Sequence, residues 1–219
     1  SGFCKYYREK VKILNDGPGF LDLFSGAGGM SYGFEKSGFK LVKAIESNYR
    51  AASTYYLNRN DISCEKVYNG DIRDFNTKKI KKSSVDVIIA GPPCQEFSKV
   101  RKNGYGENGR KELYKEVIRF VKYVKPRYVV IENVPGMASH INMKYVHKVK
   151  DGLEKNGYIV EHKLLNAREY GIPQNRIRLF FIARRIYRSK RKYAERELNR
   201  ILRRISDEVF DYEIGRAHV

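Results

Sequence analysis

FLDLFSGAGG, residues 20–29, contains the first strand-turn-helix pattern of this chain. Its apolar first half has the length and composition of a buried β-strand, and it runs into a glycine-rich turn that opens a helix. Gly26, Gly28 and Gly29 leave room for backbone N–H groups and the helix N-terminus to approach a ligand. A purely structural turn would have the same composition, so this stretch alone is weak evidence for a site.

Two acidic residues follow at the ends of the next two expected strands. Residues 40–45 form the second strand of the pattern, which ends in Glu46, and Asp71 ends the segment 67–70. A carboxylate at such a place can accept hydrogen bonds from ribose hydroxyls. Together with the glycine-rich turn, these residues predict a site for a nucleoside-containing cofactor.

A cysteine comes directly after another buried strand, 85–90, in the segment GPPCQEFS at 91–98. Two prolines fix the backbone before Cys94, so the thiol is presented by a rigid segment. A free cysteine is usually a small core residue. Its place after a strand in the same pattern as the proposed cofactor turn favours a nucleophile instead.

Strands alternate with helical stretches along the chain, which predicts an α/β fold with a doubly wound sheet. We expect helices near residues 30–37, 49–58, 112–124, 143–156 and 190–206, and the last two strands at 158–166 and 178–183.

With these motifs the chain resembles the cytosine-C5 methyltransferases over roughly residues 20–185. Four motifs carry the resemblance in the family's order: DLFSGAGG, GPPCQEFS, Glu132-Asn133-Val134 and Gln174-Asn175-Arg176-Ile177-Arg178. The resemblance implies a class I S-adenosylmethionine-dependent methyltransferase fold, which is Rossmann-like, with a mostly parallel sheet and an antiparallel final pair of strands.

The resemblance also implies S-adenosylmethionine as the cofactor. The residues that it places there are Phe24, Ser25, Gly26, Ala27, Gly28, Gly29, Glu46, Asp71, Ile72 and Pro93. Ser25 to Gly29 would lie along the methionine end of the cofactor.

The catalytic residues implied by the resemblance are Cys94, Glu132, Arg176 and Arg178. Cys94 would add as a thiolate to C6 of a flipped cytosine, and Glu132 would bond N3 and the exocyclic amine. Arg178 would contact the pyrimidine O2. Two residues apart on a strand, the arginines would point to one face; in isolation, such a pair more often faces water.

The charge of the chain suits a polyanionic partner. There are 44 Lys and Arg residues against 25 Asp and Glu, and residues 184–204 alone hold ten basic and two acidic residues. A nucleic acid is therefore the natural candidate, and the resemblance implies double-stranded DNA. A solvated basic helix and an adaptation to high temperature remain open for residues 184–204.

The glycine-interrupted segment 96–112 has the composition of a loop that closes on a substrate.

Three cysteines without a CxxC pair indicate neither a disulfide framework nor a zinc site, and we expect no metal. No apolar run approaches the roughly 20 residues of a membrane span. We expect a cytoplasmic, prokaryotic, nucleoid-associated protein with no membrane partner.

We divide the chain into an N-terminal extension (1–19), a catalytic domain (20–185) and a basic helical segment (186–219). Family members continue beyond the arginine motif with a target-recognition domain, which we do not find. A separate target-recognition subunit and a truncated chain both remain open. Residues 213–219 have a weak similarity to the family's closing motif, but a disordered or tag-derived tail is favoured.

The predicted activity is that of a DNA (cytosine-5)-methyltransferase, as a restriction-modification methylase or its catalytic subunit. Two alternatives stay open: an RNA (tRNA) cytosine-C5 methyltransferase, and a catalytically silent DNA-binding or regulatory subunit. The presence of both Cys94 and Glu132 argues against the silent subunit.

Overall fold

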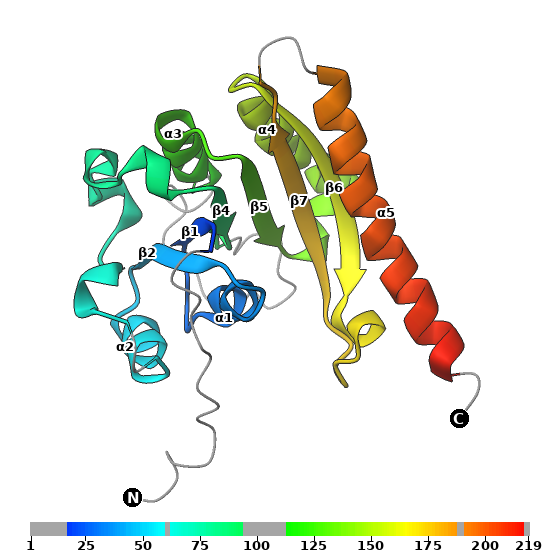
Figure 1. The fold of residues 1–219 in the computed structure, drawn as a ribbon, viewed down its shortest axis with the longest axis horizontal. Helices are drawn as coiled ribbons and strands as arrows, with labels where there is room; N and C mark the ends of the chain where they lie inside the picture. Colours follow the sequence, from blue (N-terminus) through cyan, green and yellow to red (C-terminus); the bar gives the residue numbers. More distant parts are fainter. Residues whose placement is uncertain (1–16, 60–61, 94–112, 188–190, 217–219) are drawn as a thin grey trace, which may run out of the picture.

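A seven-stranded sheet forms the centre of the protein (Figure 1). The structure, a computed structural model, describes residues 17–59, 62–93, 113–187 and 191–216. The strand order is β3-β2-β1-β4-β5-β7-β6. The strands from β3 to β5 are parallel, and β7 runs antiparallel to both β5 and β6. The predicted α/β fold and its antiparallel final strands are confirmed.

The strands are β1 (Gly19–Leu23), β2 (Lys40–Glu46), β3 (Val67–Asn69), β4 (Val87–Ala90), β5 (Tyr128–Asn133), β6 (Tyr158–Asn166) and β7 (Ile177–Arg185). The longer helices are α1 (Gly29–Lys36), α2 (Tyr49–Leu57), α3 (Tyr114–Val124), α4 (Met143–Glu154) and α5 (Arg191–Arg216). Short 3-10 turns include η3 (Ile72–Asp74) and η8 (Ala167–Tyr170).

The end of α5 differs from the prediction. The helix continues about ten residues past the expected end near 206, so the disordered tail expected from residue 213 is wrong for residues 213–216. Apolar residues continue at helical spacing through Leu198, Ile201, Ile205 and Val209, which explains the extension.

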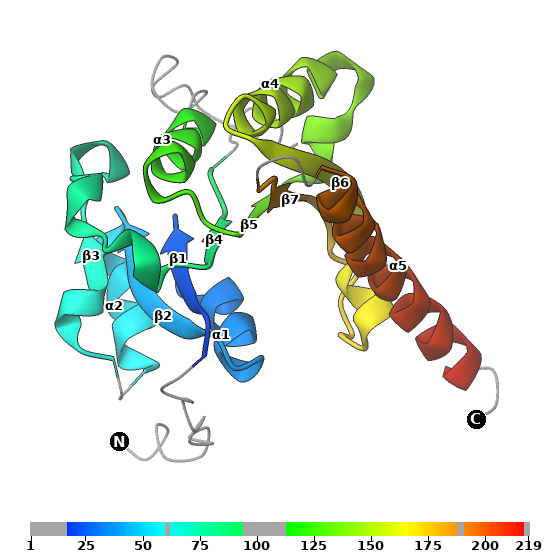
Figure 2. The same cartoon turned by 45° about the horizontal axis from the view of Figure 1, so that its top comes forward.

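Helices cover both faces of the sheet. Side chains alternate along β1: Leu21 packs in the core on the side of α3 and α4, and Phe20 packs in the core on the side of α1 and α2. Figure 2 shows α3 and α4 on one side of the sheet and α1 and α5 on the other.

Ion pairs hold α5 on the antiparallel end of the sheet. Glu197 of α5 accepts hydrogen bonds from Arg184 at 2.9 Å, from Arg127 at 3.0 Å and from the Tyr128 hydroxyl. Burial opposes ionisation of Glu197, but the bonds from Tyr128 and Arg184 and the charge of Arg184 outweigh it and lower its pKa to about 2. Glu197 is therefore a carboxylate at neutral pH.

Within the described ranges, no helix combines the length and apolarity needed to cross a bilayer.

Candidate functional site

Segments from different parts of the chain meet at the carboxyl edge of the parallel strands. The backbone N–H of Ser25 bonds the carbonyl of Ile45 at 3.1 Å, and that of Gly91 bonds the carbonyl of Leu23 at 3.1 Å. These bonds join the ends of β1, β2 and β4. The loop after β1, residues 24–28, is hereafter the glycine loop.

The glycine loop has an unusual backbone. Phe24, Gly26 and Gly28 have φ angles of 60°, 56° and 88°. A left-handed conformation costs a non-glycine residue such as Phe24 about 1 kcal/mol or more, and such strain is common at functional sites. No atom lies within 4 Å of a Cβ built at Gly26 or Gly29. These two residues leave the open space that the sequence predicted.

Gly28 also has a packing role within the protein. A Cβ built there would lie 2.5 Å from Nη1 of Arg59 and 2.6 Å from the ring of Tyr55. The missing side chain therefore makes room for protein atoms from α2 and the residues after it.

Glu46, at the end of β2, supports the glycine loop through hydrogen bonds. Its Oε2 accepts the N–H of Gly26 at 2.8 Å, and its Oε1 accepts the N–H of Asn48 at 2.8 Å. Each carboxylate oxygen can accept a further hydrogen bond. Glu46 thus combines loop support with capacity for a hydroxyl donor.

The other predicted cofactor residues lie at neighbouring strand ends. Asp71 follows β3 and accepts bonds from the backbone N–H of Arg73 at 2.8 Å and from its guanidinium. The bond from the Arg73 side chain lowers the pKa of Asp71. Ile72 is buried in the core, and Pro93 is exposed.

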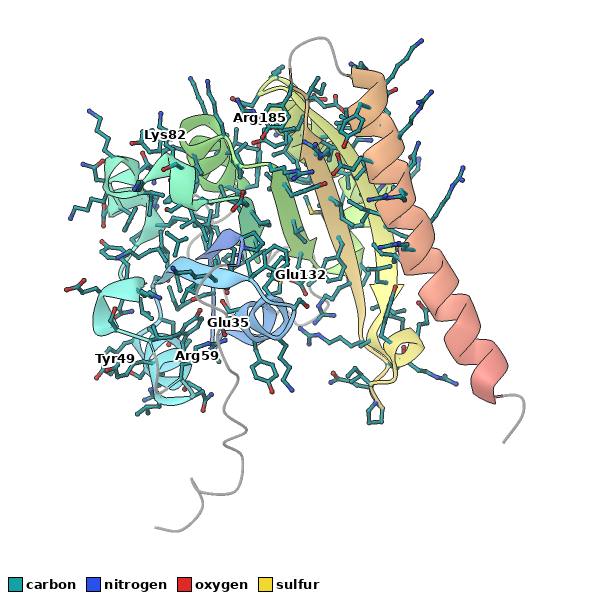
Figure 3. All side chains as sticks on the ribbon, viewed as in Figure 1. Glu35, Tyr49, Arg59, Lys82, Glu132 and Arg185 are labelled. Carbon is teal, nitrogen blue, oxygen red and sulfur yellow. The ribbon has the colours of Figure 1, made fainter. Side chains whose placement is uncertain are left out.

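Glu132, Arg176 and Arg178 come together in the structure. Arg178 Nε lies 2.9 Å from Glu132 Oε1, and Arg176 Nη2 lies 3.9 Å from the same oxygen. In Figure 3, Glu132 lies near the carboxyl end of β5. The side chains of Glu132 and Arg178 are 23% and 25% exposed, against 50% for Arg176. Arg178 is thus the closer and better shielded partner of Glu132.

Sequence reasoning missed that Gly91 joins the two groups of residues. A Cβ built there would lie 3.8 Å from Glu132 Oε2, 3.9 Å from the carbonyl oxygen of Phe24 and 3.7 Å from Met30. Gly91 therefore lies between the glycine loop and Glu132. Only the pairing of β4 between β1 and β5 creates this contact, so no local pattern could have revealed it.

Two asparagines that sequence reasoning also missed support the site. The buried Asn133 directs its side-chain amide to the carbonyl of Pro92 at 3.4 Å. Asn166 caps η8 and accepts the backbone N–H of Arg176 at 3.0 Å. An asparagine at the end of an expected strand was the available signal for each.

Cys94 and the segment 94–112 lie outside the described residues. Their predicted roles as nucleophile and closing loop stay predictions.

An apolar groove of about 420 Å³ lies between α2 and β3. Its lining residues are Tyr49, Ala52, Ser53, Tyr56, Leu57, Val67 and Asn69. None of the predicted site residues lines this groove. In the described part of the chain, no group of three or more His, Cys, Asp or Glu residues could hold a metal ion.

Comparison with known proteins agrees with this geometry. Residues 19–214 match the family model described as C-5 cytosine-specific DNA methylase. Type II methyltransferase M1.HphI from Haemophilus parahaemolyticus is 36% identical over 187 residues, covering 84% of this chain and 50% of the relative. M.AquIA from Picosynechococcus is 33% identical over 180 residues, covering 76% of this chain and 71% of the relative.

Among solved structures, a DNMT2 mutant from Spodoptera frugiperda has 28% identity and a TM-score of 0.62. The match covers 78% of this chain and 51% of that one. The chain spans half or less of the length of several curated relatives it matches.

Proposed function

Because this chain belongs to the C-5 cytosine-specific DNA methylases, we propose that it transfers a methyl group to C5 of cytosine in DNA. It would act as a restriction-modification methylase or as the catalytic subunit of one. The observation that supports this most is the Glu132 to Arg178 ion pair, which lies beside Gly91 and the glycine loop.

The family uses S-adenosylmethionine, and the residues present fit this cofactor. Glu46 retains acceptor capacity for ribose hydroxyls after bonding Gly26 and Asn48. Gly26 and Gly29 leave open space for the methionine end. Phe24, Ser25, Ala27, Asp71, Ile72 and Pro93 would line the rest of the site. When bound, S-adenosylmethionine supplies an electrophilic methyl group.

Cys94 would activate the base by adding its thiolate to C6, which makes C5 nucleophilic. A free thiol has a pKa near 8.5, so the site must favour the thiolate or remove the proton during attack. At the end of the reaction the C5 proton leaves and the bond from sulfur to C6 breaks, which restores the aromatic ring.

Glu132 would stabilise the activated pyrimidine through hydrogen bonds to N3 and the exocyclic amine. Arg178 fixes Oε1 of Glu132, and the other oxygen, Oε2, lies near Gly91. With its remaining N–H groups Arg178 would bond O2 of the base. The base must be flipped out of the duplex to reach these groups, at a cost of a few kcal/mol.

The basic charge of the chain supports DNA as the substrate, because phosphate contacts supply affinity without sequence information. A separate recognition subunit stays a prediction, as does a prokaryotic, nucleoid-associated location.

The experiment is transfer of a labelled methyl group from S-adenosylmethionine to duplex DNA and to tRNA, with nearest-neighbour analysis of the product. A second arm traps the enzyme on DNA containing 5-fluorocytosine, where fluorine blocks the elimination step. Cys94→Ser should abolish the covalent adduct, whereas the matched control Cys4→Ser should retain it. An adduct with Cys94→Ser would contradict the nucleophile, and label in tRNA alone would favour the RNA enzyme.

A further inference from the structure

A buried polar network lies against the glycine loop and joins β1, α1 and α2. Ser31 of α1 donates to Asp22 Oδ2 of β1 at 2.5 Å, and the Tyr55 hydroxyl of α2 donates to Ser31 Oγ at 2.7 Å. Asp22, Ser31 and Tyr55 are all fully buried. None of these three side chains has a part in the proposed reaction.

Arg59, two residues after α2, completes the network and reaches the loop itself. Its Nη2 donates to the carbonyl of Gly28 at 2.8 Å, and its Nε donates to Glu35 at 2.9 Å. Its guanidinium also stacks over the ring of Tyr55, at 4.1 Å from the centroid. Figure 3 shows Glu35 and Arg59 close together beside α1. The Arg59 side chain is only 8% exposed, so these contacts are shielded from water.

The glycine loop needs such external support. Three of its five residues have positive φ angles, and sparsely populated backbone conformations persist only where the surroundings fix them. Glu46 fixes the loop at Gly26, and Arg59 fixes it at Gly28. Tyr55 supports Arg59 through its ring and fills the space where Gly28 lacks a side chain.

We propose that Tyr55 and Arg59 are positioning residues, which set the affinity for S-adenosylmethionine by holding Gly28 in its binding conformation. This inference rests on the proposed cofactor site. Both residues act through the loop. When only a fraction of the molecules has the competent loop conformation, the apparent Kd rises in inverse proportion to that fraction.

The test is calorimetry with S-adenosylhomocysteine on wild type, Arg59→Met, Arg59→Lys and Tyr55→Phe. Arg59→Met loses a charged donor and should raise Kd about tenfold or more. Arg59→Lys keeps the charge but can reach only one of the two partners, so it should restore part of the affinity. Tyr55→Phe removes the hydroxyl bond to Ser31 that holds the ring against Arg59 and Gly28, so it should raise Kd about threefold.

Two controls separate positioning from general stability. Arg50→Met removes an exposed arginine of α2 and should leave Kd unchanged. Val149→Ala removes buried volume from α4, on the other face of the sheet, and should lower Tm without changing Kd. Folded Arg59→Met and Tyr55→Phe proteins that bind within twofold of wild type would overturn the inference, as would an equal rise in Kd with Val149→Ala. If Arg59→Met does not fold, Tyr55→Phe decides. A wild-type chain that does not bind would overturn the proposed cofactor site as well.

Discussion

At the scale of single residues, Arg176 and Arg178 offer a comparison within one chain. Both face Glu132, but Arg178 is 2.9 Å from its carboxylate and Arg176 is 3.9 Å away and more exposed. We expect Arg178→Ala to lower kcat/KM about a hundredfold, because it loses a shielded, charge-assisted bond. Arg176→Ala should cost much less. Single-turnover methyl transfer measures the activity of both variants. Equal losses of activity in Arg178→Ala and Arg176→Ala would contradict this ranking.

Asp22 predicts a specific dependence of stability on pH. Burial raises its pKa from 3.8 to about 7, although the bond from Ser31 and the charge of Arg59 oppose the rise; Glu35 and Glu46 add to it. The folded state therefore binds more protons than the unfolded state between these values. Asp22 therefore makes its full contribution to the free energy of unfolding below about pH 4, and this contribution is lost as pH rises through 7.

Asp22→Asn should remove this loss, because an amide stays neutral at every pH. At about 1.4 kcal/mol for each pKa unit, the difference between wild type and variant should change by a few kcal/mol from pH 4 to 8. Urea denaturation at several pH values measures it. A difference that does not vary with pH would show that Asp22 does not titrate in this range.

At the scale of elements, the junction of β1 with α1 makes a second prediction about stability. Gly28→Ala places a Cβ against Arg59 and Tyr55 in addition to its backbone strain, whereas Gly26→Ala meets open space. We expect the free energy of unfolding to fall by about 3 kcal/mol in Gly28→Ala and by about 1 kcal/mol in Gly26→Ala. Equal losses would mean that the contacts with α2 add nothing to the backbone strain.

The docking of α5 can be tested through two acidic residues on the same helix. Glu197→Gln leaves Arg184, whose side chain is 4% exposed, without its charged partner, at a cost of about 3 kcal/mol. The control Glu195→Gln removes an exposed pair with Arg191 and should cost less than about 0.5 kcal/mol. Urea denaturation compares them, and a negligible loss with Glu197→Gln would contradict the anchoring role.

The contrast between predicted and observed elements has a physical basis. The strands of the sheet follow from apolar runs that end in glycine or an acid, because parallel strands are buried on both faces. Local patterns do not show that Arg59 reaches Gly28, that Glu197 binds β5 and β7, or that Phe24 has a positive φ. Each depends on contacts between distant segments.

At the scale of the whole molecule, the net charge of +19 predicts how this chain alone handles DNA. We expect binding to random duplexes with little sequence preference, and affinity that falls steeply from about 50 to 200 mM salt as counterions are released. Fluorescence anisotropy across that range measures the slope. Efficient, site-specific methylation by these 219 residues would contradict the expectation and place recognition in the basic segment after Ala183.

The two edges of the sheet bear on how the protein resists aggregation. An exposed edge strand can recruit a strand from another molecule, and proteins limit this with short edges and charged side chains. At one edge β3 offers only three residues for such pairing. At the other edge β6 is nine residues long, but it carries Glu161 and Lys163 on the same face. A foreign strand therefore finds a short template at one edge and a charged one at the other, and we expect the chain to stay dispersed at high concentration.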